Sequence, residues 1–211
     1  MRGSIFTCLV FALVFTGAVA DAQEVRGCGN LSNAFGPYDY RDPDARGYPL
    51  HIVEGAHFTP EVEALQKGHT GYLVGDLDYT LRAFPNHHRA LNAISRYALA
   101  GGHGWTNPSV RSADCYFERA VAFRPDDEIV HLLYANYLAK RGDDEGATKH
   151  YEEALRIAPS APEVAYDAGL FFFKQGDMAR AKDLARIAYT GGYPLPGLKN
   201  MIAEAESKNK Q

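Results

Sequence analysis

Two segments of this chain, ADCYFERAVAFRP at residues 113–125 and ATKHYEEALRIAP at residues 147–159, share one arrangement of small, aromatic and proline residues. The two segments begin 34 positions apart, and a third, partial copy contributes three further alanines. The matched positions are Ala113, Phe117, Ala120 and Pro125, then Ala147, Tyr151, Ala154 and Pro159, then Ala181, Ala185 and Ala188. A fixed period of this length is typical of units that stack on one another to bury their apolar faces.

Each unit has the pattern of two helices separated by a glycine. Ala147, Tyr151 and Ala154 recur at helical spacing and define one apolar stripe. Gly142 ends the helix before this stripe, because glycine adopts the left-handed C-cap without a side-chain clash. The three acidic residues that follow it favour a helix N-terminus. Gly142 returns 34 positions later as Gly176, so the same helix, turn and helix are predicted in both units.

This unit of 34 residues resembles the tetratricopeptide repeat (TPR). The resemblance implies an all-α fold, a right-handed αα-superhelix, and a module that binds a protein partner and uses no cofactor. The predicted solenoid spans residues 59–208. It consists of a degenerate helix pair at 59–85, repeats at 86–125, 126–159 and 160–194, and a C-terminal cap at 195–208.

The first repeat is longer than the others, because its prolines, Pro85 and Pro125, are 40 positions apart. The extra residues are expected in the loop 101–108, which contains the single tryptophan, Trp105. A loop insertion often decorates one face of a repeat protein, so Trp105 is a candidate partner contact. The alternative is that Trp105 folds back onto an adjacent helix.

Residues 1–22 have the features of a secretory signal peptide, since Arg2 precedes an apolar run and small residues offer two cleavage sites. The alternative is a membrane anchor, but an apolar run of roughly 15 residues is shorter than the ~20 that a spanning helix needs. The sequence therefore predicts an exported protein of bacterial type, periplasmic or secreted, with no stable membrane insertion after cleavage. Residues 23–58 follow as an irregular arm rich in turn residues and tyrosines, with a short extended piece expected at 50–53.

Three cysteines are present, and Cys8 lies in the predicted signal peptide. The remaining pair, Cys28 and Cys115, predicts a disulfide that ties the arm to the solenoid in an oxidising compartment. The alternative is two unrelated thiols. The formal net charge of −4, without a basic run, makes nucleic acid a poor candidate partner.

Candidate chemistry is sparse. Most of the eight histidines lie in the first half, among them His57, His87 and His88, with Asp76 near them in the sequence. No metal-ligand spacing, nucleophile elbow or phosphate-binding loop is present. The sequence therefore predicts a scaffold without catalysis, metal or cofactor. A metal- or small-ligand-binding protein that uses the histidine-rich half is the alternative.

The resemblance also implies a concave groove lined by the first helix of each repeat. Carried over by position, the polar and aromatic groove residues are Arg89, Asn92, Arg96, Asn136, Tyr166 and Phe173. Asparagine can pair with a peptide backbone and arginine with a carboxylate, so these residues are the candidate site for a protein or peptide partner. The alternative is that the N-terminal arm itself fills the groove.

Overall fold

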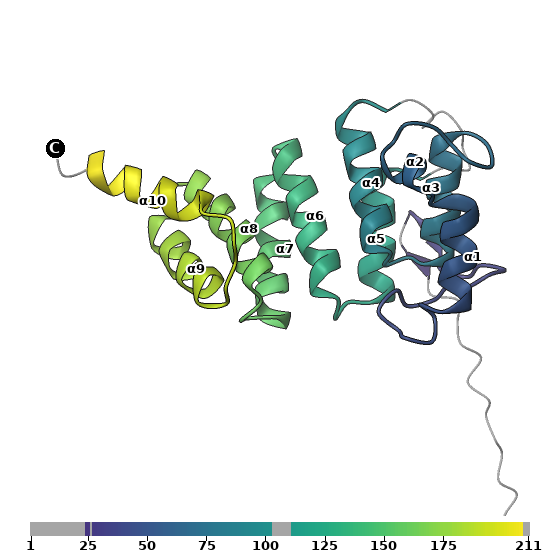
Figure 1. Cartoon of the computed structure of the whole chain (residues 1–211), viewed down its shortest axis with the longest axis horizontal. Helices are drawn as coiled ribbons and strands as arrows, with labels where there is room; N and C mark the ends of the chain where they lie inside the picture. The colour runs from purple at the N-terminus through teal and green to yellow at the C-terminus, as the bar shows by residue number, and fades with distance from the viewer. Residues whose placement is uncertain (1–23, 26, 103–110, 209–211) are drawn as a thin grey trace, which may run out of the picture.

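The computed structural model describes residues 24–25, 27–102 and 111–208. Two short antiparallel strands, β1 (Glu24–Val25) and β2 (Gly29–Asn30), open this part of the chain, and helices dominate the rest (Figure 1). The helices are α1 (Tyr48–His57), α2 (Pro60–Glu63), α3 (Leu73–Ala83), α4 (His88–Leu99), α5 (Ala113–Phe123), α6 (Glu128–Arg141), α7 (Asp144–Ile157), α8 (Pro162–Lys174), α9 (Met178–Thr190) and α10 (Gly197–Lys208). Among the described residues, no helix combines the length and apolarity needed to cross a membrane. The predicted signal peptide and Trp105 lie outside the described residues.

The helices from α4 to α10 stack in pairs. Within the pairs, α4 packs on α5, α6 on α7 and α8 on α9, and successive pairs meet through α5 and α6, then α7 and α8. The first helices α4, α6 and α8 and the single helix α10 are consecutive neighbours and form one layer. The result is an elongated molecule with the elements from β1 to α3 at one end and α10 at the other (Figure 1). We call the elements from β1 to α3 the N-terminal unit. The predicted all-α superhelix of stacked helix pairs is confirmed.

Alanines at the repeated positions let neighbouring helices approach closely. The fully buried ones include Ala147, Ala154, Ala181 and Ala188. The approach is close at Gly169 of α8, where a β-carbon would lie 2.5 Å from Cδ2 of Leu198 in α10. A glycine therefore replaces the alanine that the preceding repeat has at this position, Ala135.

The helix ends follow the signals in the sequence. Gly142 ends α6 with a left-handed φ of 81°, and the N–H of Asp143 donates to the carbonyl of Leu138. The side chain of Asp143 then accepts from the N–H of Gly146 at the start of α7. Asp177 caps α9 in the same way. In these repeats one glycine and one aspartate therefore stop a helix and start the next.

The N-terminal unit differs from the prediction. Residues 48–57, expected in the irregular arm, form helix α1, so the extended piece predicted within them is wrong. Leu50 and Val53 are three residues apart and both pack in a cluster with Phe84, a spacing that fits one face of a helix and not of a strand. The first helix of the pair predicted at 59–85 is the short α2, and the chain then turns at Leu65, which has a left-handed φ of 59°.

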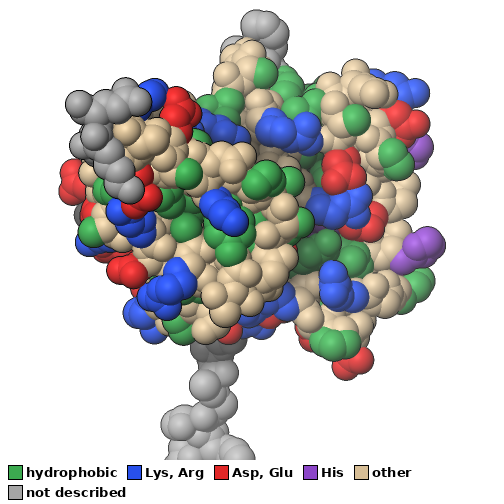
Figure 2. All heavy atoms as spheres, turned by 60° about the vertical axis from the view of Figure 1, so that its left-hand side comes forward, with side chains coloured by type: hydrophobic (Ala, Val, Ile, Leu, Met, Phe, Trp, Pro, Cys, Tyr) green, Lys and Arg blue, Asp and Glu red, His purple; other side chains and the backbone are tan. Residues whose placement is uncertain are grey.

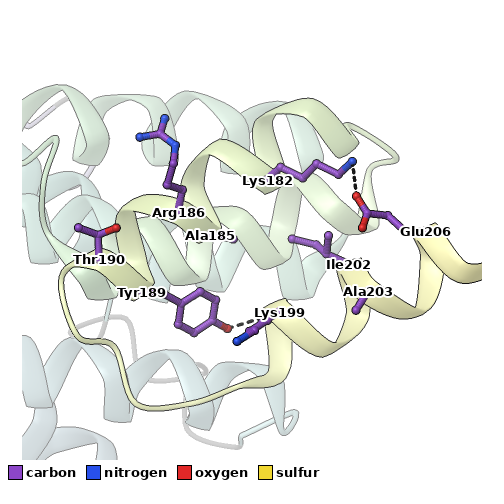
Figure 3. A pocket seen from close by; sticks show the side chains of 9 residues that line it. All are labelled: Lys182, Ala185, Arg186, Tyr189, Thr190, Lys199, Ile202, Ala203 and Glu206. Atoms are coloured by element: carbon purple, nitrogen blue, oxygen red, sulfur yellow. Dashed lines mark hydrogen bonds and ion pairs between the residues drawn. The ribbon is translucent and has the colours of Figure 1, made fainter.

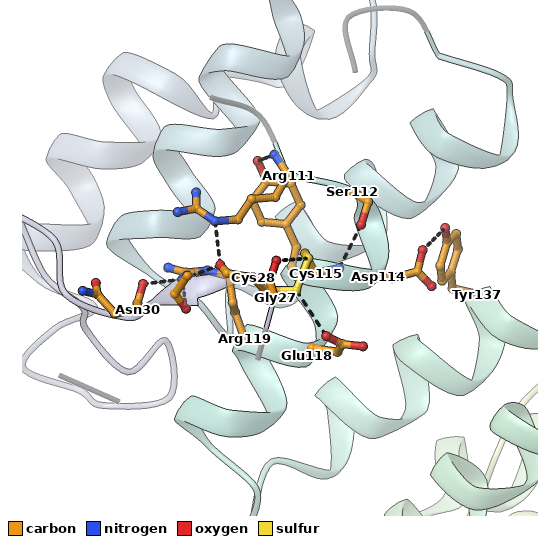
Figure 4. Close-up of a disulfide and its surroundings, with 12 residues drawn as sticks. Gly27, Cys28, Asn30, Arg111, Ser112, Asp114, Cys115, Glu118, Arg119 and Tyr137 are labelled. Carbon is orange, nitrogen blue, oxygen red and sulfur yellow. Dashed lines mark hydrogen bonds between the residues drawn. A yellow bond between two sulfur atoms is a disulfide. The ribbon is translucent and has the colours of Figure 1, made fainter. Parts of the chain in front are cut away.

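A disulfide joins the N-terminal hairpin to α5 (Figure 4). It links Cys28 to Cys115, whose Cα atoms are 5.3 Å apart. Nε of Arg111 donates to the carbonyl of Cys28 over 3.0 Å, and the guanidinium of Arg119 donates to the carbonyl of Asn30. Burial lowers the pKa of Arg119 to about 10. The hairpin is therefore fixed by one covalent bond and by two arginines that satisfy its carbonyl groups.

Candidate functional site

A cavity of about 390 Å³ opens between α6 and α8, the first helices of two successive repeats. We call it the inter-repeat cavity. Its lining residues are Asn136, Ala139, Lys140, Asp144, Tyr151, Asp167, Leu170, Phe171, Lys174 and Gln175. Helix α7 contributes two of these residues and α6 and α8 contribute most of the others. The cavity therefore lies in the layer of first helices, where the groove is expected.

Asn136 connects the three helices around this cavity. Its Nδ2 donates to Oδ2 of Asp167 over 2.8 Å, and its Oδ1 accepts from the hydroxyl of Tyr151 over 2.6 Å. These two bonds fix the orientation of the amide. A carboxamide carries two N–H donors and two oxygen lone pairs, so one of each remains for a further bond.

The acid and the phenol beside Asn136 have shifted pKa values. Burial raises the pKa of the Asp167 carboxyl above its ordinary value, although the hydrogen bond from Asn136 and the charge of Lys140 act in the opposite direction. Burial and the charge of Asp167 both raise the pKa of Tyr151, so its hydroxyl stays protonated and donates to Asn136. A poorly hydrated carboxylate at this place favours a ligand that brings N–H donors.

Two lysines add positive charge to the lining of the cavity. Lys140 and Lys174 are 34 residues apart, so they occupy equivalent positions in two repeats, and both are exposed. The arrangement suits a polypeptide segment, with backbone amides at Asn136 and Asp167 and side-chain carboxylates at the lysines. The lining residues include no serine, cysteine or histidine.

Two of the three predicted groove residues of α4, Arg89 and Arg96, contact the N-terminal unit. Arg89 pairs with Glu54 of α1 at 3.2 Å and with Glu63 of α2. Arg96 donates to the backbone carbonyl of Glu63 over 2.6 Å. Asn92 is exposed on the same helix. Groups within the chain therefore bind both arginines at this end of the groove.

The two aromatic groove residues also lie outside the inter-repeat cavity. Tyr166 is buried and stacks on Tyr193, with ring centroids 4.1 Å apart. Phe173 is half-buried and packs against the core. Of the six predicted groove residues, Asn136 is the one that lines the cavity.

The histidines of the N-terminal half pair with individual acids. The pairs are His57 with Asp76 at 2.8 Å, His87 with Glu54 at 3.1 Å and His88 with Asp127 at 3.0 Å. In the described part of the chain, the one group of three potential metal ligands is Cys28, Cys115 and Glu118, where both sulfurs belong to the disulfide. The alternative of a histidine metal site gains no support from these pairs.

The sequence interpretation missed Tyr151, Asp167 and the two lysines as site residues. The lysines carried a usable signal, because they recur at the period of the repeat. Asp167 carried no such signal, since it lies 31 residues after Asn136 and therefore off the repeat period. Asp167 meets Asn136 only because α6 and α8 stack side by side.

One comparison with known families bears on the repeats. Residues 135–176 match a family model described as a TPR repeat. The match begins in α6, includes α7 and extends just past the end of α8, so it contains the helices that form the inter-repeat cavity. The stacking of α4 to α10 agrees with the architecture that this family adopts. The chain therefore contains a tetratricopeptide repeat at residues 135–176.

Proposed function

We propose that this protein is a non-enzymatic scaffold that binds a protein or peptide partner in its concave groove, with the inter-repeat cavity as the main contact. Repeats of this family serve in protein interactions in general. The assignment of the binding site to the inter-repeat cavity depends on one observation. Asn136, half-buried among apolar groove residues, keeps hydrogen-bonding capacity beside the carboxyl of Asp167.

The partner would enter as a polypeptide segment. A backbone carbonyl of the segment accepts from the remaining N–H of Asn136, and a backbone N–H donates to Asp167. An acidic side chain of the same segment lies near Lys140 and Lys174. The affinity should then fall as the salt concentration rises, because salt screens the attraction between exposed lysines and a carboxylate.

Export of the chain belongs to the same proposal. A disulfide such as Cys28–Cys115 is typical of an oxidising compartment, and such a compartment agrees with the predicted signal peptide. The intact mass of the protein recovered from its source cells tests this part. Cleavage after Ala20 or Ala22 is the expected result, and a retained Met1 would contradict export through a cleaved signal.

Site-specific photo-crosslinking tests the groove. A photoreactive amino acid at Ala139, which lines the cavity, should give a discrete adduct with a protein partner in the source cells. The matched control carries the same group at Lys149, which is exposed on α7. Lys174→Glu should weaken the adduct at position 139. Equal adducts at both positions, or none at position 139, would refute binding in the inter-repeat cavity.

A further inference from the structure

A second cavity, of about 520 Å³, lies between α9 and α10 at the C-terminal end of the solenoid (Figure 3). We call it the terminal cleft. Ala185 and Tyr189 of α9 and Ile202 and Ala203 of α10 give it apolar walls. Two of these residues are alanines, so the cleft has room for another chain to come close to both helices.

The repeat register explains why the terminal cleft is open. Gly169 of α8 faces α9, since a β-carbon there would lie 3.3 Å from Cβ of Leu184. The residue 34 positions later is Ala203 of α10, and it is exposed. Helix α9 covers this face of α8, whereas no helix follows α10 in the described chain to cover the equivalent face. The terminal cleft is therefore the place that the second helix of another repeat would occupy.

The equivalent seam one repeat earlier, which is lined by residues of α7, α8 and α9, shows what such a helix contacts. Glu152 and Leu155 of α7 and Phe172 of α8 line that seam together with Arg180 of α9. The residues 34 positions after the first three are Arg186, Tyr189 and Glu206, and all of them line the terminal cleft. The contacts made by α9 are therefore available again one repeat later.

The charge at one of these contacts is reversed. In the covered seam, Glu152 pairs with Arg180 of the arriving helix at 2.9 Å. In the terminal cleft, the position of Glu152 is taken by Arg186. A helix that lies in the terminal cleft must therefore carry a carboxylate where α9 carries Arg180.

The rest of the border is also mainly basic. Lys182, Arg186 and Lys199 line the terminal cleft, and Glu206 is its one acidic residue. Lys182 and Glu206 pair with each other at 2.6 Å (Figure 3), so the net positive charge of the lining residues comes from Arg186 and Lys199. Arg186 also contacts Asp183, at 3.3 Å, and both of these side chains are exposed. With the C-terminal end turned forward, basic side chains lie beside hydrophobic ones over this face (Figure 2).

We propose that the terminal cleft binds an amphipathic α-helix of a partner protein, whose apolar stripe is bordered by carboxylates that face Arg186 and Lys199. This surface is separate from the inter-repeat cavity, so either site can exist without the other. Two copies of this chain that met through the same cleft would bring their basic borders together, which is unfavourable. A partner of opposite charge is therefore the better occupant.

Two designed peptides of about 18 residues, roughly 27 Å as a helix, test the proposal. Both have the same leucine stripe, and the borders are glutamate in one and lysine in the other. Each carries a fluorophore, and its anisotropy is followed as the intact protein is added. The glutamate peptide should bind, with an affinity that falls as salt rises. The lysine peptide should bind roughly tenfold more weakly or not at all.

Variants then locate the binding. Arg186→Glu and Lys199→Glu should each weaken the glutamate peptide several-fold, and Ala203→Gln should weaken it by filling the cleft with an uncharged side chain. All three residues are exposed, and thermal unfolding confirms that each variant is folded. Lys149→Glu on α7 is the matched control and should leave the affinity unchanged. Equal affinity for both peptides, or no effect of the three variants, would overturn the proposal. A dimer of the unliganded protein that Ala203→Gln dissociates would overturn it in favour of a second copy.

Discussion

Asn136 of α6 donates to Asp167 of α8 over 2.8 Å, and this bond joins the first helices of two repeats. The same amide accepts from the hydroxyl of Tyr151 in α7. One asparagine therefore links all three helices around the inter-repeat cavity. It contributes to the packing of the repeats as well as to the surface offered to a partner.

Asn136→Ala should lower the free energy of unfolding by ~1 to 3 kcal/mol, because it leaves the hydroxyl of Tyr151 and the carboxyl of Asp167 without their partner. Chemical denaturation measures this change. Asn92→Ala is the matched control, since Asn92 is exposed on the equivalent helix of the preceding repeat and its loss should cost less than ~0.5 kcal/mol. Equal losses in the two variants would mean that the bonds of Asn136 contribute nothing to stability.

Asp167→Asn should make the protein more stable at neutral pH. The folded-state pKa of Asp167 is raised by burial, so the native state resists ionisation of this group. Its contribution to stability is present below the unfolded-state pKa and is lost as pH rises through the folded-state pKa. The advantage of the asparagine variant over the original protein should therefore appear at pH 7 and disappear near pH 3. An advantage that is the same at both pH values would contradict the raised pKa.

The pair His131 and His150 should make the free energy of unfolding depend on pH in the opposite direction. Nε2 of His131 lies 3.2 Å from the carbonyl of Pro125 and must donate to it, so Nδ1 of His131 accepts from Nδ1–H of His150 over 3.0 Å. Burial, and next the neighbouring His131, lower the pKa of His150 to about 4, and burial also lowers that of His131. Both rings are therefore neutral in the folded protein at pH 7.

A lowered histidine pKa means that the unfolded chain binds more protons than the native state in mildly acidic solution. The free energy of unfolding should therefore fall by roughly 1 to 3 kcal/mol between pH 6.5 and pH 4. His150→Gln should reduce this slope, and the exposed His51→Gln serves as its control. Denaturation curves recorded across this range decide the matter, and parallel curves for the original protein and His150→Gln would refute it.

Cys28→Ser should destabilise the protein by less than the ~4.5 kcal/mol that chain entropy alone allows for a bond across 87 positions of sequence. The hairpin is also held through Arg111 and Arg119, so the reduced chain keeps part of its order there. Denaturation with and without reductant gives the cost. Thiol titration of the unreduced, denatured protein gives the bonding state, and two free thiols would show that the bond does not form.

The repeat period made the C-terminal half of the fold predictable. Gly142 ends α6 with a left-handed φ, and Asp143 and Asp177 cap the starts of α7 and α9, so these helix boundaries follow local features of the sequence. The N-terminal unit has no copy of these features. Helix α1 was missed because the segment holds many turn residues, and its helical spacing becomes visible only where Leu50 and Val53 meet Phe84, the C-cap of α3.

The sequence located the first helices of the repeats, and the side-chain contacts between these helices were harder to predict. The register placed Asn136 correctly on α6 but gave no sign that Tyr151 and Asp167 would bind it. The partners of Arg89 and Arg96 are Glu54 and Glu63, which lie outside the clear repeats, so the repeat register gave no sign of these particular pairs. Pairings between stacked units depend on how the helices approach, which single-sequence patterns do not encode.

The register of the stack can itself be tested at Ala154, which is fully buried on α7. Ala154→Leu forces extra side-chain volume between closely packed helices and should lower the free energy of unfolding by ~1 to 3 kcal/mol. Lys149→Leu adds an apolar side chain to the exposed face of the same helix and should change it by less than ~0.5 kcal/mol. Both are measured by urea denaturation. Because intrinsic helix propensity favours leucine and alanine alike, a large loss at position 154 with none at 149 reports packing and not helix formation. Equal effects at the two positions would show that α7 presents a different face to its neighbours.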